Sequence, residues 1–217
     1  MPDDVIKDFA TIALTGVAPN VVTVHPSLPV RSIKDLIALA KARPGELNYG
    51  TAGTGSTNHL SVELFSAMAG VKLTRVAYKG TGPSVTALVA GETHLVFANS
   101  QSVGTQVKAG RLRAVAVTSS KPSALLPDLP TVAASGLPGY EAISIDGIWA
   151  PAKTPAPVVD RINQEVVRAL NRADVKQRFL DAGVETAPSS PQELASMVRS
   201  ELAKWGKVVK DAGIRVP

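Results

Sequence analysis

The segment "YGTAGTGSTNHLSVELF", residues 49–65, gathers glycines and hydroxyl side chains into a short run that then becomes amphipathic. Just before it, "ELNYG" (46–50) predicts a short strand. After the run, four apolar side chains recur at helical spacing: Leu60, Leu64, Phe65 and Met68. Gly70 suits the C-terminal end of that helix. The segment therefore predicts a strand, a glycine-rich turn and a helix.

The same alternation extends to both sides of this segment. β-branched and apolar runs predict further strands at 20–26, 71–78, 94–98 and 112–118. Helical patterns lie between them at 32–43, 82–91 and 102–110. Strands that alternate with helices imply a mostly parallel sheet with helices on both faces. We expect this α/β unit to span residues 21–144.

The remainder of the chain has a different pattern. Residues 119–141 form a proline-rich loop that we expect to enclose one short helix near 131–135, and a strand follows it. Three helices are then predicted at 158–171, 174–182 and 191–212. Because this helical tail has no run of strands of its own, we expect residues 1–20 and 145–217 to pack together as a second, mostly helical lobe.

Composition excludes several classes of function. The chain has 217 residues, 45% of them hydrophobic, and no Cys, which rules out disulfides, Cys metal sites and thiol catalysis. The net charge is +5, but the Lys and Arg residues are scattered along the sequence and aromatic residues are few. We therefore expect no nucleic-acid partner. Three isolated histidines do not predict a metal site, and no cofactor motif is present. No apolar run reaches the roughly 20 residues that would cross a bilayer, and we expect no direct membrane insertion.

The glycine-rich turn is suited to holding an anion. Ligands of open α/β sheets gather at the carboxyl ends of strands, and the N-terminus of a helix offers N–H groups without intrahelical partners. Gly53 and Gly55 let a ligand approach the backbone. Neighbouring residues add polar side chains: Thr51, Thr54, Ser56, Thr57 and Asn58. Lys79 and Asn99 each follow a predicted strand, so both are candidates for the same crevice.

Sharper motifs do not fit this turn. A Walker loop requires a Lys after the last glycine, and the Rossmann fingerprint requires a third glycine where Asn58 stands. The G-x-S-x-G nucleophile elbow is also absent. A hydrolase or transferase that uses Ser56 stays open as an alternative, although we interpret His59 as a packing or capping residue. A glycine-rich turn with a Ser/Thr cap and no ligand is a further alternative.

Several long blocks resemble a known family, the substrate-binding proteins of tripartite tricarboxylate transporters, often called Bug proteins. The blocks are 5–65, "VAYKGTGPSVTALVAGETHLVFAN" (76–99), "AGRLRAVAVTSSKPSALLPDLPTVAASGLPGYE" (109–141), "GIWAPAKTPAPVVDRIN" (147–163) and "KWGKVVKDAGI" (204–214). The resemblance implies a two-lobed, type II periplasmic-binding-protein fold that closes around a small carboxylate. It also implies a non-enzymatic receptor that delivers its ligand to the membrane subunits of a transporter.

The resemblance also implies where the carboxylate is held. Family members use two strand–turn–helix loops, one per lobe, and the second corresponds to residues 51–58. The first loop, its leading β/α units and a signal peptide have no counterpart in the sequence, so we expect a first lobe that is shortened at its N-terminal end. The family is periplasmic, so we expect a periplasmic location, or a cytoplasmic one if the chain is complete as written. Some relatives carry an acidic residue at the position of Ala98, so we expect a plain carboxylate rather than an amino acid.

Overall fold

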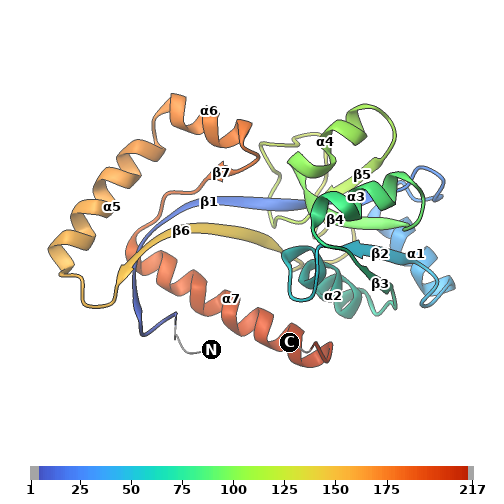
Figure 1. Ribbon diagram of the computed structural model, residues 1–217, viewed down its shortest axis with the longest axis horizontal. Helices are drawn as coiled ribbons and strands as arrows, with labels where there is room; N and C mark the ends of the chain where they lie inside the picture. Colours follow the sequence, from blue (N-terminus) through green and yellow to red (C-terminus); the bar gives the residue numbers. More distant parts are fainter. Residues whose placement is uncertain (1–4, 215–217) are drawn as a thin grey trace. The chain divides into compact units, whose positions relative to one another are not determined.

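The computed structural model describes residues 5–214, which divide into two compact units (Figure 1). Unit 1 comprises residues 5–18 and 144–207, and unit 2 comprises residues 19–143 and 208–214. The strand β1 (Phe9–Val24) belongs to both units, because its first half lies in unit 1 and its second half in unit 2. The glycine-rich turn lies entirely in unit 2.

The sheet of unit 2 has the strand order β3-β2-β4-β1-β5. Besides β1, its strands are β2 (Asn48–Thr51), β3 (Thr74–Ala77), β4 (Leu95–Asn99) and β5 (Arg113–Val117). β2 is parallel to β3 and β4, but β1 is antiparallel to β4 and β5. The prediction of a mostly parallel sheet was therefore wrong around β1. Helical crossovers fix the direction of β2, β3 and β4, whereas β1 enters from unit 1 without such a crossover.

Helices cover both faces of this sheet (Figure 1). They are α1 (Ile33–Ala42), α2 (Thr57–Ala69), α3 (Thr81–Val89) and α4 (Ser100–Lys108). Side chains along β4 point alternately to the two faces of the sheet. Val96 and Ala98 join a core cluster with residues of α3 and α4. Phe97 points to the other face, where its ring lies 5.5 Å from that of Phe65 on α2. The two crossovers thus place α2 and α3 on opposite sides of β2 and β4.

Unit 1 combines two strand pairings with the three C-terminal helices. β6 (Ile143–Pro151) pairs with β1, and the short β7 (Glu185–Thr186) pairs with Gly16 and Val17. The helices are α5 (Ala156–Leu170), α6 (Ala173–Asp181) and α7 (Pro191–Asp211), close to their predicted positions. The Asn163 amide donates to the carbonyl of Ile12 at 2.8 Å, which ties α5 to β1. Among the helices of residues 5–214, none combines the length and apolar character needed to span a bilayer.

Two further sequence predictions differ from the structure. The strand predicted at 20–26 begins much earlier, at Phe9. The strand can continue through Pro19 because this residue lies where β1 changes partners, between the pairing of Val17 with β7 and that of Asn20 with β4. The short helix predicted near 131–135 is absent. Instead, Thr131 bridges Val117 and hydrogen-bonded turns follow it.

Candidate functional site

The glycine-rich turn lies at the edge of the unit 2 sheet where three parallel strands end. β2, β3 and β4 run side by side in the same direction, and Thr51 at the end of β2 is level with Ala77 at the end of β3. The turn leaves β2 directly, while Lys79 lies just after β3 and Asn99 is the last residue of β4. The structure therefore brings the predicted residues of all three segments to one edge of the sheet.

Two glycines give the turn its shape. Gly53 has a φ of +135° and Gly55 a φ of +76°, conformations that favour a residue without Cβ. The Thr51 hydroxyl is buried and accepts the N–H of Gly53 at 3.4 Å. Ser56 caps α2, because its Oγ accepts the N–H of His59 at 3.3 Å and donates to the carbonyl of Gly53 at 2.9 Å. The hydroxyls of Thr51 and Ser56 are thus engaged within the turn.

Other donors of the turn are free. In the described part of the chain, the backbone N–H groups of Thr54, Thr57 and Asn58 have no hydrogen-bond partner. Thr57 and Asn58 are the first two residues of α2, where the helix dipole adds a partial positive charge. The Asn58 side chain is buried and donates to the carbonyl of Phe97 at 2.6 Å, so it supports the helix rather than facing solvent. Backbone amides, more than side chains, are the groups of this turn that are free to bind an anion.

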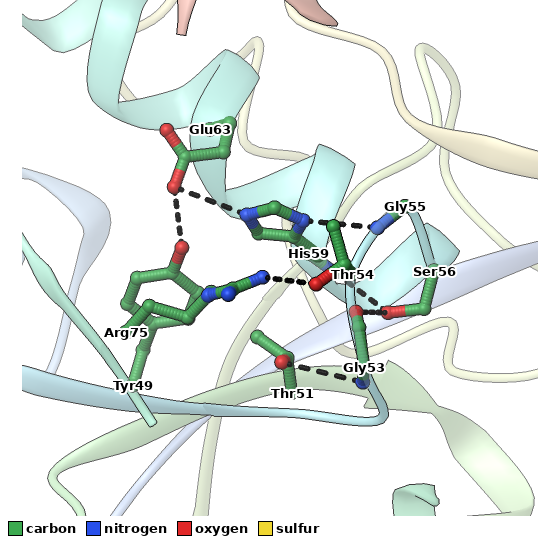
Figure 2. Close-up of polar contacts among 9 residues, drawn as sticks. All are labelled: Tyr49, Thr51, Gly53, Thr54, Gly55, Ser56, His59, Glu63 and Arg75. Carbon is green, nitrogen blue, oxygen red and sulfur yellow. Dashed lines mark hydrogen bonds and ion pairs between the residues drawn. The ribbon is translucent and has the colours of Figure 1, made fainter. Parts of the chain in front are cut away.

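A polar network, buried at Tyr49 and His59 and exposed at Arg75, adjoins the turn (Figure 2). The Nδ1 atom of His59 accepts the N–H of Gly55 at 3.2 Å, and its Nε2 atom lies 3.6 Å from Oε1 of Glu63. The Tyr49 hydroxyl donates to the same Glu63 oxygen. From β3, Arg75 donates to the hydroxyl of Thr54 at 3.1 Å. Sequence reasoning missed Tyr49, Glu63 and Arg75, although the i,i+4 spacing of His59 and Glu63 is a signal for that pair.

The network keeps the Glu63 carboxylate charged. Its hydrogen bond with His59 lowers the pKa of Glu63, and the Tyr49 hydroxyl and the Arg75 charge act in the same direction against the effect of burial. Burial, followed by the hydrogen bond to Glu63, raises the pKa of Tyr49, so the phenol stays protonated and donates. The charged carboxylate orients both contacts, because Tyr49 donates to Glu63 and Nε2 of His59 faces the same oxygen.

The geometry gives no support to catalysis by Ser56. Both ring nitrogens of His59 are engaged, one by Gly55 and one by Glu63. The Ser56 hydroxyl directs its hydrogen to the carbonyl of Gly53. Without a base at that hydroxyl, activation of Ser56 as a nucleophile lacks its first requirement. The buried position of His59 and its contact with the turn match its interpretation as a packing and capping residue.

The remaining predicted residues have different surroundings. Lys79 is exposed. Asn99 is the N-cap of α4, and its Oδ1 accepts the N–H of Ser102 at 2.9 Å. Ala98 is buried in the core against α3 and α4, so the expectation that this position bears on an amino-acid ligand has no structural basis. Over residues 5–214, His, Asp and Glu form no group of three that could hold a metal ion.

Comparison with known proteins gives consistent matches over nearly the whole chain. A family model described as the tripartite tricarboxylate transporter family receptor matches residues 1–214. The UPF0065 protein of the tcbD-tcbE intergenic region of Pseudomonas sp. (strain P51) is 36% identical over 204 residues, which are 94% of this chain and 61% of that relative. Protein BugT of Bordetella pertussis is 31% identical over 216 residues, which are 100% of this chain and 66% of BugT. The chain thus spans about two thirds or less of these curated relatives.

Solved structures agree with this result. The R. palustris protein Rpa4515, solved with adipate, has a TM-score of 0.83 and 40% identity, over 99% of this chain and 72% of that one. MatC from Rhodopseudomonas palustris, solved with bound malate, has a TM-score of 0.76 and 30% identity over 94% and 70% of the two chains. The periplasmic binding protein BugD has a TM-score of 0.76 and 30% identity, over 95% of this chain and 70% of BugD. These likenesses confirm the predicted α/β fold of the periplasmic-binding-protein type.

Proposed function

Because this chain belongs to the tripartite tricarboxylate transporter receptor family, we propose that it is a solute-binding protein that captures a small carboxylate and delivers it to the membrane subunits of a transporter. The family resemblance predicted from the sequence blocks is thereby confirmed. We place the protein in the periplasm and assign it no chemical step. The ligand would bind at the carboxyl edge of the unit 2 sheet.

The free backbone donors at the start of α2 carry this proposal. The N–H groups of Thr54, Thr57 and Asn58 are unpartnered, close together in sequence and next to the positive end of a helix. A carboxylate that accepts two or three backbone N–H bonds gains charge-assisted hydrogen bonds, which are stronger than neutral ones. Gly53 and Gly55 keep side chains away from that approach, and the exposed hydroxyls of Thr54 and Thr57 add further polar groups.

Lys79 and Asn99 complete the proposed site. Both lie at the ends of strands parallel to β2, at the edge from which the turn emerges. Lys79 is a flexible cation that can reach toward an anion from its exposed position. Asn99 already caps α4 through its Oδ1 atom, which leaves its amide N–H₂ group as the part able to donate to a ligand.

We further propose that the ligand is a short aliphatic dicarboxylate. Two relatives with 40% and 30% identity were solved with adipate and malate, both of this class. The turn would hold one carboxylate through backbone amides, which recognise the anion and not the rest of the molecule. Selection of chain length would then fall to the groups around the second carboxylate.

A substitution at Thr57 tests the central role of the backbone donors. Thr57 is the first residue of α2, a position where proline is favoured and its missing N–H costs the helix nothing. Ser56 before it has a φ of −65° and a ψ of 157°, which a following proline accepts. Thr57→Pro therefore removes one anion donor with little effect on folding, and Thr57→Ala removes only the hydroxyl.

Isothermal titration with adipate, malate and a neutral diol as negative control would measure the result. We expect Thr57→Pro to weaken dicarboxylate binding by about tenfold, the value of one charged hydrogen bond. Thr57→Ala should change it by less than about threefold. Equal affinities for the wild type and Thr57→Pro would remove the start of α2 from the site. Turnover of a simple ester that disappears in Ser56→Ala would contradict a purely binding role.

A further inference from the structure

One N–H group of the turn is not available to a ligand. The amide of Gly55 donates to Nδ1 of His59, which is 4% exposed and lies in the first turn of α2. Gly55 has a positive φ, which glycine adopts readily. Few local constraints other than this hydrogen bond therefore hold its peptide in place. The contact joins the middle of the flexible turn to the rigid start of the helix.

The ring of His59 is itself fixed from the other side. Oε1 of Glu63 lies 3.6 Å from Nε2, and the hydroxyl of Tyr49 donates to that same oxygen (Figure 2). Tyr49 is a buried residue of β2, the strand before the turn, and Glu63 lies one helical turn beyond His59. The two elements that flank the turn are therefore linked through one row of polar side chains that ends at the Gly55 peptide.

From this geometry we propose that His59 is the positioning residue of the anion-binding turn, acting through Gly55 rather than touching the ligand. This inference deepens the proposed function and rests on it. His59 holds the Gly55 peptide, so that the neighbouring N–H groups of Thr54, Thr57 and Asn58 stay free and in place. Preorganisation of this kind raises affinity because the turn pays no ordering cost when the ligand arrives.

The role requires one protonation state of the ring. Nδ1 must be without hydrogen to accept from Gly55, and Nε2 must carry the hydrogen that faces Glu63. Protonation of Nδ1 would place two donors opposite each other and release the Gly55 peptide.

Polar groups on three elements surround this ring. Glu63 on α2 is the carboxylate beside Nε2, and Arg75 on β3 donates to Thr54. Tyr49 on β2 stays neutral. A hollow of about 280 Å³ adjoins the network and is lined by Thr54, His59, Glu63, Arg75 and residues 212–214. Residues 212–214 add no charged side chain to it.

Two substitutions separate the two sides of the ring. The Oδ1 atom of Asn lies about as far from Cα as Nδ1 of His, so His59→Asn keeps an acceptor for Gly55. The amide of Gln reaches about as far as Nε2, so His59→Gln keeps the contact with Glu63 and leaves Gly55 without its acceptor. Both variants lose the ring, so they are matched for the loss of packing.

Nuclear magnetic resonance of the full chain tests the positioning without any ligand. In the wild type at neutral pH we expect His59 to be the Nε2–H tautomer and the Gly55 amide to be protected from exchange. His59→Gln should lose that protection by about tenfold or more, and His59→Asn should keep most of it. A wild-type ring with hydrogen on Nδ1, or Gly55 protection equal in the wild type and His59→Gln, would overturn the proposal, and the first of these outcomes needs no variant to fold.

Titration with adipate and malate tests the consequence for binding. We expect His59→Gln to weaken the affinity by about tenfold. His59→Asn should keep most of the wild-type affinity. If neither dicarboxylate binds the wild type, the proposed function fails while the resonance result still decides the role of His59. Affinities that are equal for wild type and His59→Gln would contradict positioning for binding.

Discussion

The side-chain amide of Asn58 donates to the main-chain carbonyl of Phe97 at 2.6 Å, which fastens the first turn of α2 to the central part of β4. Asn58 belongs to the turn that the sequence predicts to bind an anion, yet its side chain is buried and faces the sheet. Its backbone N–H and its side chain thus have separate roles, the first toward the proposed ligand and the second toward the fold.

Replacement of Asn58 should lower stability more than it lowers affinity. Asn58→Ala leaves the buried carbonyl of Phe97 without this donor, and an unsatisfied buried group costs about 1–3 kcal/mol. Urea unfolding followed by circular dichroism would measure the loss. Thr57→Ala, on the exposed side of the same turn, is the control and should stay within about 0.5 kcal/mol of the wild type. Equal stability of Asn58→Ala and Thr57→Ala would show that the bond to Phe97 contributes little.

Gly53 should tolerate a methyl group in space but not in backbone conformation. A Cβ at Gly53 would meet nothing within 4 Å, but the φ of +135° is strained for any other residue. We expect Gly53→Ala to lower the free energy of unfolding by about 1–3 kcal/mol, or to reshape the turn and weaken binding.

Gly104 in α4 provides the matched control for that substitution. It also has open space around its Cβ position but lies in a helix, where Ala is favoured. Gly104→Ala should raise stability by about 0.5–1 kcal/mol. Melting temperature and carboxylate affinity, measured together, would separate strain from steric exclusion, and a Gly53→Ala protein identical to the wild type in both would contradict the role given to its φ.

Glu63 should make the folded protein sensitive to acid. Its pKa is lowered in the fold, so its stabilising contribution is fully present above the ordinary pKa of a glutamate and is lost as the pH falls through the lowered value. Glu63→Gln should therefore flatten the decline in unfolding free energy at acidic pH. The pKa values of Asp35, Asp174 and Glu193 are also lowered, so part of the decline should remain.

Glu193 is a suitable control for this experiment. Its pKa is also lowered, by hydrogen bonds from the N–H and hydroxyl of Ser190, but the carboxylate is fully exposed. Because solvent screens exposed interactions, Glu193→Gln should change the pH dependence less than Glu63→Gln. Stability curves of the wild type and Glu63→Gln that run parallel from about pH 7 to about pH 3 would show that the network does not depend on the charge of Glu63.

Periodicity predicted most of the elements of this chain but not which face of α2 is buried. The spacing of apolar residues in that helix predicted a buried face that includes Leu64 and Met68, yet Met68 is 39% exposed. The buried face instead includes Asn58, His59 and Ser61. Each of these polar side chains has a partner distant in sequence or in the adjacent turn, and a pattern that counts only apolar residues does not register them.

Strand direction was the other feature that the sequence did not reveal. Residues 20–24 read as a strand, but the run has the same composition whichever way it points in a sheet. Its antiparallel pairing follows from contacts with residues 95–99 and 113–117, far away in the chain. By contrast, the strand–turn–helix shape of the glycine-rich segment could be predicted, because it depends on local features: two glycines, a capping Ser and the start of a helix.

Phe65 should contribute more to stability than any apolar residue on the outer side of α2. Its ring is fully buried and makes edge contacts with Phe97 at 5.5 Å and with Tyr140 at 6.3 Å between ring centroids. Phe65→Ala removes both contacts and leaves a cavity beneath the helix that begins at the glycine-rich turn, at a cost of about 3–5 kcal/mol.

Met68→Ala on the same helix is the matched comparison, because Met68 is largely at the surface and should lose less than about 1 kcal/mol. Urea unfolding of both variants measures the difference. Phe65→Ala should also weaken dicarboxylate binding indirectly, since α2 carries the N–H groups of Thr57 and Asn58. Similar losses in the two variants would mean that the face of α2 toward Phe97 and Tyr140 is not the one that anchors the helix to the sheet.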